Sequence, residues 1–190
     1  MKQQIMRQFR DFTLTPCLFL FGALILLSLP TRAEVTSVNA SGFALNYEQT
    51  VKADRDAIYT ALSQIGQWWD PSHSWEGVAE NLYLELSPGG CFCETLSNGG
   101  LARHLQVLYY APGKEIRLGG GLGPLQGMGM WGAMVWTITP AEEGNTVKWT
   151  YTVTGHGTEE SMKGLAPIVN SVQQQAFDRL IRYIKSGSPE

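Results

Sequence analysis

The sequence predicts an α+β fold in which a curved antiparallel β-sheet wraps around a long C-terminal α-helix. Three observations carry this prediction. Apolar and polar residues alternate over several segments between 43 and 154, as in strands with one buried face. Apolar residues recur at helical spacing over 58–69 and again over 165–184. An apolar sheet face and an apolar helix stripe must cover each other, and a curved sheet leaves a hollow beneath the helix.

Residues 1–33 have the pattern of a signal peptide. Three basic residues precede an apolar run at 18–29, and Thr31-Arg32-Ala33 offers small residues where signal peptidase cleaves. We expect cleavage before Glu34 and a mature chain of residues 34–190 that forms a single domain in the periplasm or outside the cell. The alternative is an uncleaved anchor, because about 20 apolar residues can span a bilayer.

The charge of the chain disfavours one class of partner. The sequence has 14 Lys and Arg against 17 Asp and Glu, and a net charge of −3. Nucleic-acid binding relies on clustered Lys and Arg, and the sequence has no such cluster. We therefore expect no nucleic-acid partner, and no membrane partner after signal cleavage. The oligomeric state stays open.

The remaining elements follow from local signals. The first strand is expected at 43–51, after a lead rich in Ser, Thr and Asn. Asp54 then caps a helix that ends near 66–69, because Asp70-Pro71 disfavours its continuation. Later strands are expected at 82–86, in a hairpin over 88–110, and at 115–118, 131–139 and 146–154, with a glycine-rich loop at 119–129.

The hairpin carries most of the chemistry of the chain. Asn98-Gly99 is the dipeptide of a two-residue type I′ turn. If Ser97 pairs with Gly100, Cys93 lies opposite His104, and Glu94 lies opposite Arg103. One face then carries Cys91, Cys93, His104 and Gln106, and the other carries Phe92, Leu96, Leu101, Leu105 and Val107 around the Glu94–Arg103 pair.

The last helix has one apolar stripe and one polar side. Leu165, Val172, Leu180 and Ile184 belong to the stripe, and Gln173 lies off it. Such a helix is expected to lie across the sheet.

Several motifs together resemble a known superfamily. They are Val51-Lys52-Ala53 before the first helix, Trp68-Trp69 with His73 at its exit, Leu84-x-Leu86-x-Pro88-Gly89-Gly90-x-Phe92-x-Glu94, Pro112-Gly113-Lys114, and Trp136-Thr137-Ile138-Thr139-Pro140. With the element order, they resemble the START/birch-pollen-allergen-like superfamily (SRPBCC), in its polyketide cyclase/dehydrase-like branch. The resemblance implies a helix-grip fold over 43–186 and a cavity for an apolar or amphipathic ligand. Some relatives are cyclases, hydrolases or lipid carriers.

We therefore expect an exported protein that binds a small hydrophobic or amphipathic molecule between its sheet and its C-terminal helix, without a cofactor. The expected ligand-binding residues are Phe92, Leu105, Val107, Trp149, Tyr151 and Met130. The glycine-rich loop is interpreted as a flexible lid over the pocket mouth, or alternatively as a passive connection.

Two other functions stay open. The first is a cyclase- or hydrolase-like enzyme in which Glu94 and Arg103 are catalytic, with Tyr109, Tyr151 or His104 assisting. An ordinary cross-strand ion pair is the alternative for Glu94 and Arg103. The second function is a module that binds a peptide or protein in the same groove.

The two cysteines of the mature chain have several interpretations. Cys91, Cys93 and His104 could hold a metal ion, but only Gln106 offers a fourth ligand, so we expect no metal site. Cys91 and Cys93 could form a disulfide, or His104 could activate a cysteine nucleophile. Packing as small apolar side chains is the simplest alternative.

Overall fold

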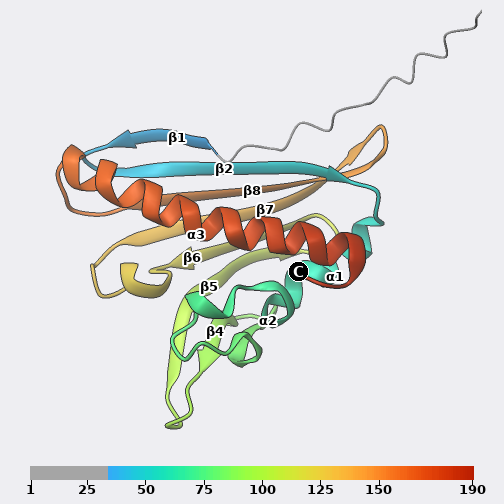
Figure 1. Cartoon of the computed structure of the whole chain (residues 1–190), viewed down its shortest axis with the longest axis horizontal. Coiled ribbons are helices and arrows are strands. Elements are labelled where there is room, and N and C mark those ends of the chain that lie inside the picture. The colour runs from blue at the N-terminus through green and yellow to red at the C-terminus, as the bar shows by residue number, and fades with distance from the viewer. Residues whose placement is uncertain (1–33) are drawn as a thin grey trace, which may run out of the picture. The chain divides into compact units, whose positions relative to one another are not determined.

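The computed structural model describes residues 34–190, so the predicted signal peptide lies outside the described residues. Within 34–190, eight strands form one antiparallel sheet in the order β1-β2-β8-β7-β6-β5-β4-β3 (Figure 1). The strands are β1 Glu34–Asn39, β2 Gly42–Val51, β3 Leu82–Leu84, β4 Cys91–Thr95, β5 Leu101–Ala111, β6 Glu115–Gly120, β7 Trp131–Ala141 and β8 Gly144–Thr154.

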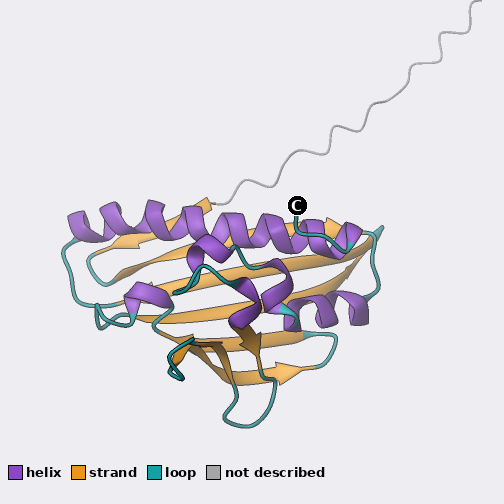
Figure 2. Ribbon diagram, turned by 60° about the horizontal axis from the view of Figure 1, so that its bottom comes forward, coloured by secondary structure: helices purple, strands orange, loops and turns teal. Residues whose placement is uncertain are grey.

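The helices cover one face of this sheet (Figure 2). They are α1 Arg55–Ser63, α2 Ile65–Trp68 and α3 Glu159–Ser186, with short 3-10 turns η1 Pro71–His73, η2 Ala79–Asn81 and η3 Gly123–Leu125. The predicted fold class, a curved antiparallel sheet around a long C-terminal helix, is confirmed. In the described part of the chain, no helix is both long and apolar enough to cross a bilayer.

Strand β1 was not expected from the sequence. Its residues pair with β2 through a bulge between Val35 and Ser37, and both Val35 and Val38 pack against the core. The bulge breaks the two-residue alternation that identifies a strand, which explains why this segment reads as an irregular lead.

Helix α3 begins earlier than its apolar stripe indicates. A capping box fixes the start: the Thr158 side chain accepts a hydrogen bond from the Ser161 backbone N–H, and the Ser161 hydroxyl accepts one from the Thr158 N–H. Gly187 ends the helix in the left-handed conformation, with a φ of 77°. The helix therefore has 28 residues and packs against β1 and β2 on one face of the sheet (Figure 1).

The space between α3 and the sheet is partly filled by aromatic rings. Trp149 lies 4.9 Å from Trp136, 5.9 Å from Trp68 and 6.2 Å from Phe177, measured between ring centroids. The contacts continue from Trp68 through Trp69 to Phe92. These tilted and edge-to-face ring pairs stabilise the fold beyond their buried area, and they anchor α2 and α3 to the strands.

Gly132 on β7 makes room for one large ring of this core. A Cβ built at Gly132 would overlap the ring and hydroxyl of Tyr151, which is fully buried on the neighbouring strand β8. Tyr151 therefore lies against bare backbone, where a side chain would displace it.

We predict that Gly132→Ala lowers the free energy of unfolding by about 1–3 kcal/mol, the usual cost of overpacking a core. Gly164→Ala is the matched control, because a Cβ there meets nothing within 4 Å. Since alanine favours helix over glycine, the control is expected to unfold at the same or a higher urea concentration. Equal urea midpoints for Gly132→Ala and wild type would show that the Tyr151 ring has room to move.

Candidate functional site

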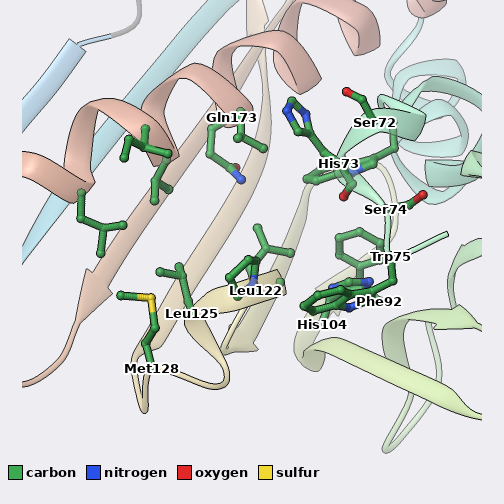
Figure 3. Close-up of a pocket in the computed structure, with 17 residues that line it drawn as sticks. Ser72, His73, Ser74, Trp75, Phe92, His104, Leu122, Leu125, Met128 and Gln173 are labelled. Atoms are coloured by element: carbon green, nitrogen blue, oxygen red, sulfur yellow. The ribbon is translucent and has the colours of Figure 1, made fainter. Parts of the chain in front are cut away.

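A cavity of about 310 Å³ lies between α3, the η1 segment, the β4–β5 hairpin and the glycine-rich loop (Figure 3). This is the lower end of the size range of small-molecule sites. Helix α3 and the loop supply mostly apolar side chains: Leu165, Ile168, Val169, Val172, Gln173, Leu122, Pro124, Leu125 and Met128. The opposite wall is aromatic and polar: Trp69, Ser72, His73, Ser74, Trp75, Phe92 and His104.

A bulge in strand β5 determines which hairpin side chains face this cavity. Phe92 pairs with Leu105, as predicted, but Cys93 pairs with Arg103 and Glu94 pairs with Ala102. His104 is the extra residue of β5 at this point. It is buried beside Leu105 and lines the cavity with Phe92, whose ring centroid lies 4.9 Å from the imidazole.

The turn explains the change of register. Leu96 accepts a hydrogen bond from the Gly99 N–H and donates its own N–H to Gly100. Gly99 has a φ of 83°, so a three-residue connection replaces the predicted two-residue turn. The Ser97 N–H donates to the Glu76 carboxylate instead of pairing with Gly100. The register near the turn is therefore shifted by one residue, and the bulge at His104 restores it farther along.

The predicted pair of Glu94 with Arg103 is wrong. Arg103 is exposed on the outer face of the sheet, paired with Cys93, because the shifted register turns its side chain away from Glu94. Tyr109 also lies outside: its exposed ring carries the Arg117 guanidinium 4.7 Å above its centroid. His104, expected on the opposite face beside Cys93, is the residue that contacts Glu94.

The Glu94 carboxylate is fully buried and fully partnered. Its two oxygens accept hydrogen bonds of 2.9 and 3.0 Å from the Trp75 N–H and one of 3.2 Å from the Glu76 N–H. Nε2 of His104 lies 3.1 Å from Oε2. Hydrogen bonds from backbone N–H groups offset the cost of burying this charge. They also attach the segment after η1 to the sheet and so form one wall of the cavity.

His104 is 4 % exposed. Burial lowers the pKa of its imidazole, because the charged form loses its hydration, and the neighbouring Glu94 carboxylate opposes this effect. The net direction is downward, so the imidazole is neutral at neutral pH.

Gln173 is the other buried polar group of the cavity. Its side chain is 0 % exposed, and neither Nε2 nor Oε1 has a hydrogen-bond partner in the described chain. Figure 3 shows it projecting from α3 toward the glycine-rich loop. Nδ1 of His73 is likewise buried without a partner. An amide in this state keeps a donor and an acceptor available for a bound molecule.

The expected ligand-binding residues are distributed over three places. Phe92 lines the cavity. Leu105 and Met130 line a second cavity of about 300 Å³, behind the glycine-rich loop, to which His104 also contributes. Val107, Trp149 and Tyr151 are buried in the packed core, outside both linings.

Cys91 and Cys93 are joined by a disulfide, with their Cα atoms 5.4 Å apart. They lie on the face of β4 opposite to Glu94, so the structure does not bring them together with His104 as a ligand set. In the described part of the chain, no three His, Cys, Asp or Glu side chains are grouped as metal ligands.

The glycine-rich loop borders the cavity, as predicted, through Leu122, Leu125 and Met128. The Gln126 amide donates a 2.7 Å hydrogen bond to the Arg103 carbonyl and so attaches the loop to β5. Its predicted mobility stays a prediction.

The sequence interpretation missed Gln173 and Ser74. Gln173 was placed on the polar side of the last helix, because polarity alone does not distinguish a solvated amide from one that faces a cavity. Its position directly after Val172, within the apolar stripe, is the signal that could have identified it.

No family model and no curated protein sequence matches this chain. Solved structures do match. A protein of unknown function, EF2215, from Enterococcus faecalis is 12 % identical, with a TM-score of 0.56 over 82 % of this chain and 78 % of that one. CalU16 from Micromonospora echinospora is 13 % identical, with a TM-score of 0.53 over 85 % and 88 %. SA2116, of unknown function, from Staphylococcus aureus is 12 % identical, with a TM-score of 0.54 over 75 % and 93 %.

At these identities the likeness concerns the fold. These proteins share the fold of this chain, the predicted curved antiparallel sheet around a long C-terminal helix. The ligand and any reaction must therefore be inferred from the residues of the site itself.

We predict that Glu94→Gln lowers the free energy of unfolding by about 1–3 kcal/mol, because an NH₂ group then faces donors in place of an acceptor oxygen. Backbone amides of Trp75 and Glu76 should also exchange faster with deuterated water, since both donate to this carboxylate. Glu80→Gln, at an exposed carboxylate on η2, is the control and should leave both measurements unchanged. Unchanged exchange at Trp75 in Glu94→Gln would contradict the role given to the carboxylate.

Proposed function

We propose that this protein binds a small apolar or amphipathic molecule in the cavity beneath α3. The observation that carries the proposal is the lining: a largely apolar chamber that contains one fully buried, unpartnered amide, Gln173. Burying an amide without partners costs free energy, and a ligand with one polar group would offset that cost. The apolar walls would supply most of the affinity.

The rim of the cavity supports the same proposal. Trp75, Met128 and Ile168 come from three different elements, line the cavity, and are 53 %, 53 % and 65 % exposed. Exposed apolar side chains gathered at a pocket mouth are typical of ligand sites. A bound molecule would cover part of this surface.

A second candidate function is an enzyme of the cyclase or hydrolase type. The observation in its favour is the buried Glu94–His104 pair at the cavity wall. In this version His104 is the general base and Glu94 orients it, in place of the pair of Glu94 with Arg103. Binding comes first in both candidates, so the binding test applies to either.

We further propose that the protein is exported to the periplasm or secreted. The leader pattern of residues 1–33 supports this. The Cys91–Cys93 disulfide adds support, because disulfides persist in oxidising compartments.

The binding proposal predicts that the neutral fluorescent probe N-phenyl-1-naphthylamine binds the purified protein. Val172→Trp should weaken this binding by at least about tenfold, because the larger ring fills the cavity. Ser171→Trp is the matched control: Ser171 is the preceding residue of α3, is exposed, and does not line the cavity. Equal affinity in wild type and Val172→Trp, or no binding by wild type, would overturn the proposal.

The export proposal predicts the mass of the protein recovered from a bacterial host that expresses the full chain. The periplasmic or medium fraction should contain a chain of residues 34–190, lighter by two hydrogen atoms than its reduced form. Thiol labelling without reductant should find no free cysteine in it. A full-length chain in the membrane fraction would indicate the uncleaved anchor instead.

A further inference from the structure

The Glu94–His104 contact fixes which imidazole nitrogen is free. Nε2 lies 3.1 Å from a carboxylate oxygen of Glu94, so in the neutral ring Nε2 carries the proton and donates it. Nδ1 then has a lone pair and acts as an acceptor. Among the described residues, none donates a hydrogen bond to Nδ1.

The surroundings of His104 favour its neutral form. The side chain is 4 % exposed, and burial lowers its pKa. Glu94 is also already saturated by two backbone N–H donors in addition to the imidazole. At neutral pH the cavity wall therefore contains an imidazole whose Nδ1 lone pair can accept a hydrogen bond.

The cavity is a poor environment for an anion. Its lining contains no Lys or Arg, and the Glu94 carboxylate lies directly behind the imidazole. His73 is the other titratable residue of the lining. A bound carboxylate would lose its hydration without gaining a cation, which is costly in an apolar site.

We propose that the ligand is an uncharged apolar molecule with a hydroxyl group, an alcohol or a phenol, whose O–H donates to Nδ1 of His104. This inference rests on the binding function proposed above and names its ligand class. It separates neutral hydroxyl compounds from fatty acids and other carboxylates, which an apolar cavity alone does not separate. The unpartnered amide of Gln173 supplies a further donor and acceptor in the same chamber.

The test uses four probes that share one ring system: naphthalene, 1-naphthol, 1-methoxynaphthalene and 1-naphthoate. Each is titrated by displacement of N-phenyl-1-naphthylamine. 1-Naphthol should bind about tenfold more tightly than naphthalene, through one additional hydrogen bond. 1-Methoxynaphthalene keeps the oxygen but lacks the proton, so it should bind no better than naphthalene. 1-Naphthoate should bind at least about tenfold more weakly than naphthalene.

The variant His104→Phe tests the assignment of the acceptor. It keeps an aromatic ring against Phe92 and removes Nδ1, so 1-naphthol should fall to the affinity of naphthalene while naphthalene itself is unchanged. His156→Phe, at an exposed histidine outside the cavity lining, is the matched control and should keep the preference for 1-naphthol. A preference that survives His104→Phe, or that is lost in His156→Phe, would overturn the assignment.

The four probes also test the hydroxyl inference on the wild-type protein alone, without any variant. If 1-naphthol and 1-methoxynaphthalene bind equally, or 1-naphthoate binds best, the hydroxyl inference fails while the binding function stands. If none of the four displaces the probe, and the probe itself does not bind, the binding function fails.

Discussion

The buried carboxylate of Glu94 is the group on which the site depends. It connects three separate segments of the fold: strand β4, the Trp75–Glu76 backbone after η1, and His104 on β5. An ion at this depth is tolerated only when its lone pairs are satisfied, so the partners must stay in place for the fold to be stable. The same hydrogen bonds position the cavity wall and set the tautomer of the imidazole. The hydrogen bonds that stabilise this part of the fold are therefore the ones that shape the proposed binding site.

The sequence predicted the layers of the fold well, because periodicity reports which face of an element is buried. The sheet, the closing helix and the contribution of Phe92 to the cavity all follow from such patterns. The bulge at His104 could not be predicted this way. One inserted residue leaves the hydrophobic pattern of the strand almost unchanged. It nevertheless moves the His104 side chain to the face that carries Glu94 and leaves Arg103 on the outer face of the sheet. The sequence also predicted the wrong surroundings for Gln173, because a glutamine that faces a cavity cannot be distinguished in the sequence from one that faces water.

The aromatic core explains where the cavity lies. Trp149, Trp136, Trp68 and Phe177 fill the space between α3 and the middle strands, and Tyr151 uses the room left by Gly132. Smaller and more flexible side chains from the glycine-rich loop and from the N-terminal half of α3 line the unfilled end. The large rings therefore make the core beneath α3 rigid. The aliphatic side chains of the glycine-rich loop and of α3 give the cavity an adaptable wall.

The pairing of β2 with β8 has a consequence for how the molecule reaches its native state. Phe43 lies opposite Val153, so this ladder joins segments about a hundred residues apart in the chain. Closing so long a loop costs entropy before its contacts stabilise it, and chains rich in such contacts fold slowly. The cavity walls come from four regions between Trp69 and Gln173. The complete cavity therefore forms only after the strands and α3 have come together, and no fragment shorter than residues 69–173 contains all of its walls.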